Sequence, residues 1–188
     1  MMRELATKEY TPPLAYAAAI LFLAQFATAV LLDEQAAAFG VHLLFVPVLV
    51  LLVMRVDAPA WARLAGYGWA GLSLVADITA LGSAMAGTSL AAGQVLFSLA
   101  LVPGAVWIYG ASLMEEGASR ALGAAAAAGL VFSAILGITR RLVLVGAWDL
   151  GAVLQQLALV LAIVWFAVLA KDLSAGKRHW GGPVRVVA

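Results

Sequence analysis

Six long stretches of almost entirely apolar residues constrain the fold of this chain more than any other feature. A helix needs about 20 apolar residues to cross the hydrocarbon core of a bilayer, and each stretch is close to that length. None alternates between polar and apolar residues as a membrane β-strand does. We therefore expect one all-α integral membrane domain over residues 1–188, a polytopic bundle of six transmembrane helices, with spans of Leu14–Leu32, Ala36–Met54, Leu64–Met85, Val95–Met114, Ala121–Ile138 and Leu150–Ala170.

The composition favours lipid as the solvent. Hydrophobic residues make up 65% of the 188 and charged residues only 11%, whereas a soluble domain has about 25% charged residues. A domain of this size has too much surface to bury such an excess. The net charge of +1 argues against a nucleic-acid partner, which would need a basic patch. With no cysteine, disulfides and thiolate metal sites are excluded, and no cofactor or metal site is predicted.

Lysine and arginine predict the orientation, because they collect on the cytoplasmic side of membrane proteins. If the N-terminus is cytoplasmic, so is the C-terminus, and the outer loops keep only Arg140 and Arg141. The chain would then be a multi-pass protein of the cell (inner) membrane. Nine of the 11 basic residues would lie inside: Arg3, Lys8, Arg55, Arg63, Arg120, Lys171, Lys177, Arg178 and Arg185.

An internal repeat links the even-numbered spans. Residues Gly93–Trp107 and Gly151–Trp165 are identical at nine of fifteen positions. The second span joins at an offset of 56, which places Val46-Pro47 on Val102-Pro103. These matches favour three helical hairpins in one orientation, related by an axis along the membrane normal. The alternative is that helices rich in Leu, Ala and Val resemble one another without a repeat.

Small residues concentrate in two other spans. The third contains Gly66, Gly68 and Gly71, and the fifth contains Gly123 and a run of alanines that ends at Gly129. Small side chains let helices approach closely, and close approach drives association in lipid. We therefore expect the third and fifth spans to form an inner, tightly packed pair.

Few polar residues interrupt the spans, and they identify the candidate site. In the repeat frame His42, Ser98 and Gln156 occupy one column of the second, fourth and sixth spans, and Asp77 in the third span lies at a similar depth. A carboxylate at the centre of a membrane helix is unfavourable by about 2.5–3.5 kcal/mol and usually pairs inside the bundle. Its expected partner is His42, the only histidine in a span. Such a pair would respond to pH near neutrality, but Asp77 could instead only hold helices together.

No catalytic motif survives inspection. Glu115-Glu116 followed by Arg120 resembles the EExxxR motif of the membrane metalloproteases that include prenyl-protein endopeptidases. Those enzymes also need histidines on later helices, and the only later one here is His179, outside the spans. We therefore predict no catalytic residues, and an intramembrane enzyme is the least favoured hypothesis.

The run Trp107–Leu122, WIYGASLMEEGASRAL, resembles the helix end, short charged turn and small-residue helix start of uncharacterised six-helix bacterial membrane proteins. That resemblance implies six helices and no particular activity. Two hypotheses for function remain. The first is binding or transport of a small molecule through a polar pocket in the outer half of the bundle, formed by His42, Asp77, Ser98 and Gln156. The alternative is a structural or assembly subunit that has a membrane-protein or homo-oligomeric partner and no ligand.

Overall fold

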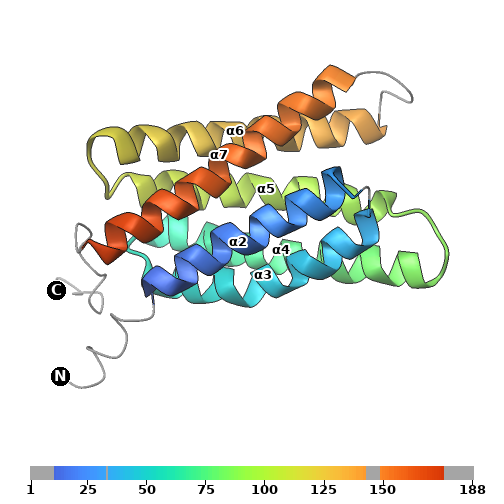
Figure 1. Cartoon of the computed structure of the whole chain (residues 1–188), viewed down its shortest axis with the longest axis horizontal. Helices are drawn as coiled ribbons and strands as arrows, with labels where there is room; N and C mark the ends of the chain where they lie inside the picture. The colour runs from blue at the N-terminus through green and yellow to red at the C-terminus, as the bar shows by residue number, and fades with distance from the viewer. Residues whose placement is uncertain (1–10, 33, 143–148, 176–188) are drawn as a thin grey trace.

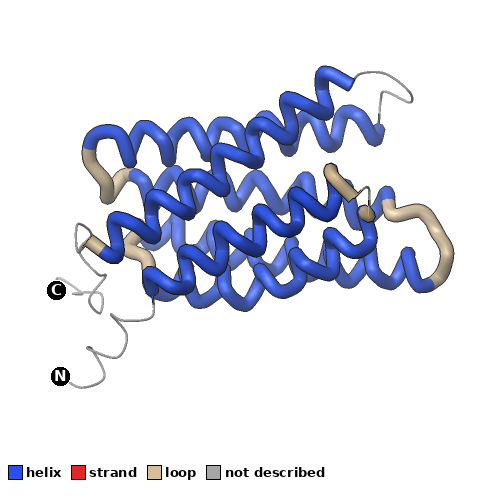
Figure 2. The backbone as a smooth tube through the Cα atoms, viewed as in Figure 1, coloured by secondary structure: helices blue, strands red, loops and turns tan. Residues whose placement is uncertain are grey.

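The chain folds into a bundle of long helices (Figures 1 and 2). The computed structural model describes the backbone of residues 11–32, 34–142 and 149–175, and the side chains of residues 11–32, 34–139 and 159–175. These residues contain no strand. The helices are α2 (Thr11–Val30), α3 (Gln35–Arg55), α4 (Ala60–Met85), α5 (Ala91–Ser112), α6 (Gly117–Leu142) and α7 (Asp149–Ser174).

The predicted six-helix, all-α architecture is confirmed. Every helix begins and ends within four residues of its expected limits, and most extend past the apolar run because a helix does not stop where the hydrocarbon stops. Within the part of the chain that the structure describes, α2, α3, α4, α5 and residues Gly117–Thr139 of α6 are long and apolar enough to cross a membrane. By length and composition, the chain is a multi-pass membrane protein.

The helices form a closed ring. Each one packs against the helices before and after it in the chain, and α2 packs against α7 to close the circle. The short connections make neighbours antiparallel, so the turns gather at two ends of the bundle (Figure 1). We call these the Met85 end, where α2, α4 and α6 finish, and the Arg55 end, where α3, α5 and α7 finish.

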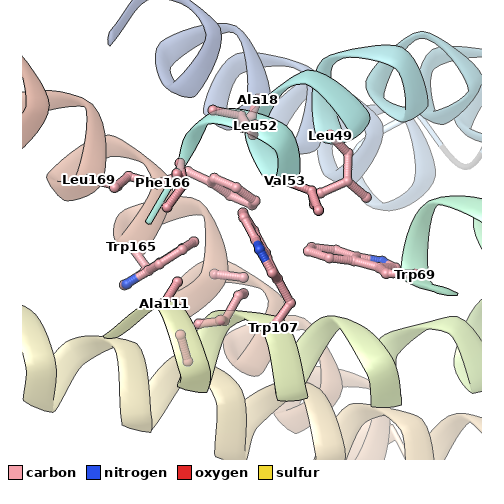
Figure 3. Close-up of a cluster of buried hydrophobic side chains, with 14 of the residues drawn as sticks. Ala18, Leu49, Leu52, Val53, Trp69, Trp107, Ala111, Trp165, Phe166 and Leu169 are labelled. Atoms are coloured by element: carbon pink, nitrogen blue, oxygen red, sulfur yellow. The ribbon is translucent and has the colours of Figure 1, made fainter. Parts of the chain in front are cut away.

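Aromatic side chains fill the centre of this ring (Figure 3). Trp69 of α4 stacks on Phe166 of α7, with ring centroids 6.3 Å apart, and Trp107 of α5 meets Trp165 of α7 edge-to-face at 5.6 Å. These rings join helices whose backbones are not neighbours, so side chains rather than backbone contacts close the middle of the bundle. We call this set the aromatic core: Phe22, Phe45, Trp69, Trp107, Trp165 and Phe166.

The expected pairing of the two helices rich in small residues is wrong. Among the described residues, α4 and α6 do not contact each other through their backbones, and α5 packs against both. Gly66 of α4 faces Trp107 of α5, while Gly123 of α6 faces Ser112 of α5 and Trp165 of α7. The glycines of α4 and α6 do permit close approach. The side chains that approach them, however, belong to α3, α5 and α7, and not to each other's helix.

The outward faces of the helices are apolar. Large aliphatic side chains on α2, α3, α4 and α6 are more than half exposed, a surface that suits a bilayer and would be unusual in water. They include Ile20, Leu44, Leu64, Ile78 and Ile135. Among the described residues, His42, Ser73, Asp77 and Ser98 are buried instead, where they can form a site.

Candidate functional site

The two ionisable residues that the sequence singled out are in contact. His42 Nδ1 on α3 lies 2.9 Å from Asp77 Oδ1 and 3.0 Å from Asp77 Oδ2 on α4. Both side chains are fully buried. Asp77 is eight residues before the end of α4, so the pair lies about 12 Å into the bundle from the Met85 end. The predicted pairing of Asp77 with His42 is confirmed.

Local sequence explains why these two side chains face inward. On α4 the buried positions include Trp69, Ser73 and Asp77, which are spaced four residues apart and therefore share one face of a helix. On α3, His42, Phe45 and Leu49 are buried at spacings of three and four. The inward faces of two adjacent antiparallel helices thus present His42 and Asp77 to each other at similar depths.

The geometry fixes where protons can lie. A carboxylate has only acceptor oxygens, so Nδ1 donates to it when Asp77 is ionised. If Asp77 is protonated, the carboxyl donates to Nδ1 instead. Buried charges are expensive unless they are paired. Two arrangements of the pair have no net charge: imidazolium with carboxylate, and imidazole with carboxylic acid. Each of them has one proton more than imidazole with carboxylate, which has a net charge of −1.

Aromatic rings enclose the imidazole. Phe45 stacks on it with centroids 5.3 Å apart, Phe97 of α5 meets it at nearly a right angle at 5.0 Å, and Phe22 of α2 lies at 6.3 Å. Phe22 and Phe45 also belong to the aromatic core. The His42–Asp77 pair therefore continues the aromatic core toward the Met85 end.

Two polar atoms near the pair lack a hydrogen-bond partner. They are His42 Nε2, on the opposite side of the imidazole from Asp77, and Ser73 Oγ, one helical turn before Asp77; both are buried. Buried polar groups in proteins are nearly always hydrogen-bonded to protein, water or a ligand. His42 Nε2 and Ser73 Oγ can therefore each form a further hydrogen bond next to the His42–Asp77 contact.

The other predicted site residues behave differently. Ser98 on α5 is buried, and its neighbour Phe97 contacts His42, but its hydroxyl donates to Gln94 O of its own helix at 2.9 Å. Serine commonly satisfies itself this way inside membrane helices. Gln156 belongs to α7, but its side chain lies outside the described residues. The structure therefore brings His42 and Asp77 together and leaves the Ser98 hydroxyl outside their hydrogen bonds.

Sequence reasoning did not identify the aromatic wall of the site. Phe45 could have been found, because it follows His42 by three residues and so shares its helix face. Phe97 and Phe22 come from other helices, and their positions depend on how α5 and α2 are rotated about their axes. Apolar residues surround these helices on all sides, so the sequence carries little information about that rotation.

Comparisons with known proteins assign no function to this site, so its chemistry is the basis for interpreting it. No protein-family model, curated protein or solved structure matches this chain. Within the described ranges, no three His, Cys, Asp or Glu side chains come together as metal ligands would.

Proposed function

We propose that this protein binds or transports a small molecule at a polar site in the outer half of the membrane, centred on His42 and Asp77. The observation that carries the proposal is a pair of ionisable side chains held 2.9 Å apart, fully buried within a bundle of apolar helices. Ionisable residues inside membrane spans are unfavourable for folding and mark ligand or proton pathways more often than packing sites. The unpartnered His42 Nε2 and Ser73 Oγ supply the capacity to bind a polar group.

Ser98 and Gln156 complete the proposal as orienting residues. The Ser98 hydroxyl donates to Gln94 O, and its oxygen can still accept a hydrogen bond from a ligand. Gln156 falls in the same column of the proposed repeat. The repeat itself draws support from Trp107 and Trp165, which the alignment equates and which touch each other edge-to-face.

Ligand-dependent stability tests this function directly. The purified protein is heated with and without each member of a metabolite panel that includes neutral, anionic and cationic compounds, alongside Asp77→Asn. We expect at least one compound to raise the melting temperature of the wild type and to lose that effect in Asp77→Asn. If no compound shifts the wild type, or if Asp77→Asn responds identically, the proposal is wrong.

We further propose that α7 is a sixth span and that both termini are cytoplasmic, in an inner membrane. The basic residues at the Arg55 end support this orientation, since positive charge stays on the cytoplasmic side. They are Arg55, Arg63, Arg120 and Lys171, from four different helices. The Met85 end would then face outward.

The alternative function, a structural or assembly subunit, is favoured by one feature of the same site. The His42–Asp77 contact joins two adjacent helices and is sealed by rings, as helix-stabilising contacts are. In that role Asp77→Asn would lower stability and change no ligand response, and the protein would copurify with a membrane partner. Isolation as a ligand-responsive monomer would rule it out.

A further inference from the structure

The chemistry of the buried pair specifies a class of ligand. We propose that the site takes a protonated amine, an organic ammonium, in exchange for the one proton that the His42–Asp77 pair carries when it is uncharged overall. This inference rests on the proposed function and adds the substrate class to it. Three observations lead to it: the charge balance of the pair, the orphaned imidazole nitrogen, and the aromatic enclosure.

The charge balance calls for a cation. When the pair loses its extra proton, imidazole and carboxylate together carry one negative charge in a fully buried position. No other described ionisable group faces it. On the surrounding helices Tyr16, Tyr67 and Tyr109 are each more than 40% exposed. Arg55 and Arg63 lie at the Arg55 end, and Glu34 precedes α3 at the other end.

The described positive charges lie far from the pair. Arg63 is 14 residues before Asp77 on the same helix, a separation of about 21 Å along the axis. On α6 and on residues 159–175 of α7, the ionisable residues with described side chains are Arg120, Lys171 and Asp172, all toward the Arg55 end. None of the described cations is near enough to neutralise the deprotonated pair, whereas a mobile cation can reach it.

The orphaned nitrogen selects a cation that donates a hydrogen bond. With Nδ1–H directed at Asp77, loss of the extra proton leaves a lone pair on His42 Nε2, which is buried and has no partner. The same event thus creates a negative charge and a hydrogen-bond acceptor. An ammonium group meets both needs, since it carries positive charge and N–H donors. Ser73 Oγ offers a second acceptor one turn away.

The enclosure selects an organic cation over a metal ion. Phe22, Phe45 and Phe97 surround the imidazole, and ring faces attract ammonium groups. Ions such as Ca²⁺ and Mg²⁺ require a shell of six or more oxygens, whereas both oxygens of Asp77 already contact His42 Nδ1. The unpartnered indole N–H groups of Trp69, Trp107 and Trp165 are donors that would suit an anion. An anion at the pair, however, would meet the carboxylate.

The exchange is balanced without any further reactant. One ammonium enters, one N–H or O–H bond of the pair breaks, and that proton passes to solvent. The pair with its bound ammonium and the pair with its proton then have the same net charge. We therefore expect the dissociation constant of the amine to fall about tenfold for each unit rise in pH while the pair is protonated.

Four related probes test this inference on the purified full-length protein in detergent between pH 5.5 and 8.5. They are 2-phenylethylammonium, its N,N,N-trimethyl analogue, neutral 2-phenylethanol and anionic phenylacetate. We expect 2-phenylethylammonium to bind with release of one proton, detected with an indicator dye in weak buffer. The trimethyl analogue, which has no N–H for His42 Nε2, should bind about tenfold more weakly or worse.

Variants and rankings separate the possible failures. Asp77→Asn should lose ammonium binding, Asp77→Glu should retain it, and Ser112→Ala, a buried serine at the Arg55 end bonded to its own helix, should match the wild type. If Asp77→Asn does not fold, the proton count and probe ranking of the wild type decide. Asp77-dependent binding of a neutral or anionic compound instead of the amines overturns the ammonium inference and keeps the proposed function. No binding of any compound overturns both.

Discussion

His42 Nδ1 contacts both carboxylate oxygens of Asp77, at 2.9 and 3.0 Å, and neither side chain is exposed. The two partners are not equivalent when one is removed. An imidazole left alone can become neutral and remain a modest polar group. A carboxyl left alone in the same place is either a buried charge without a partner or a carboxylic acid without one, and breaking a buried pair in this way is strongly destabilising.

The first prediction follows from this asymmetry. Asp77→Asn preserves size and an oxygen that can accept from Nδ1–H, so we expect a loss of about 1 kcal/mol in unfolding free energy. His42→Leu should lose about 3–5 kcal/mol. Unfolding in mixed micelles measures both, with the outward-facing Leu44→Ala on α3 as control. A larger loss for Asp77→Asn would contradict the account.

The second prediction concerns the contact between Gly104 and the aromatic core. A Cβ at Gly104 would lie 2.7 and 2.8 Å from Trp69 Cδ2 and Cε2, and Trp69 is held by rings from other helices. Because the indole cannot retreat, Gly104→Ala should destabilise the protein by about 1–3 kcal/mol.

A glycine in open surroundings provides the matched control. Nothing lies within 4 Å of a Cβ built at Gly71 on α4. There alanine should be neutral or stabilising by about 0.5–1 kcal/mol, because glycine is a poor helix former. Equal effects of the two substitutions would show that helix propensity, and not the Trp69 contact, determines the result.

The third prediction concerns a hydrogen bond between α6 and α7 at the Arg55 end. Ser119 Oγ donates to Asp172 Oδ2 at 2.7 Å. We expect Ser119→Ala to lower the unfolding free energy by about 1–3 kcal/mol, because the bond is charge-assisted and partly buried. Ser174→Ala removes a hydroxyl that bonds only its own helix, to Ala170 O, and should have little effect. If both variants unfold alike, the interhelical bond contributes nothing.

The fourth prediction concerns membrane orientation, and the absence of cysteine makes its test clean. Single cysteines at the exposed positions Ser89, Glu116 and Ala175 report on the Met85 end, the Arg55 end and the end of α7. In intact cells an impermeant maleimide should label Ser89→Cys alone, and lysis should make the other two reactive. Labelling of Ala175→Cys from outside would mean that α7 does not cross.

The sequence predicted the helices and the His42–Asp77 contact because both depend on strong, local signals. Apolar runs of about 20 residues have few alternatives to a spanning helix, and the spans contain only one histidine to meet Asp77. The sequence did not predict the contacts that depend on how each helix is rotated about its own axis. The pairing of the third and fifth spans was wrong because small residues show that something approaches closely, not which helix does. Gly66 faces Trp107 of α5, and no residue spacing within α4 predicts that contact.

The Ser98 prediction illustrates a second limit. Ser98 lies on α5, and its neighbour Phe97 contacts His42. A column of aligned positions, however, does not determine which way a hydroxyl turns, and a carbonyl four residues earlier is always within reach of a serine in a helix. The hydrogen bond of Ser98 could therefore not be predicted from its place in that column.

The ring of helices also has a consequence for how the protein is made. Among the described residues, every pair of helices in backbone contact is consecutive in the chain except α2 with α7, so each new helix can dock on its predecessor as soon as it leaves the ribosome. The contact between α2 and α7 must wait for the end of translation. Until α7 is made, we expect the first five helices to form an open arc whose aromatic residues face lipid. Chains truncated before α7 would keep this exposed face, and we expect a membrane protease to degrade them.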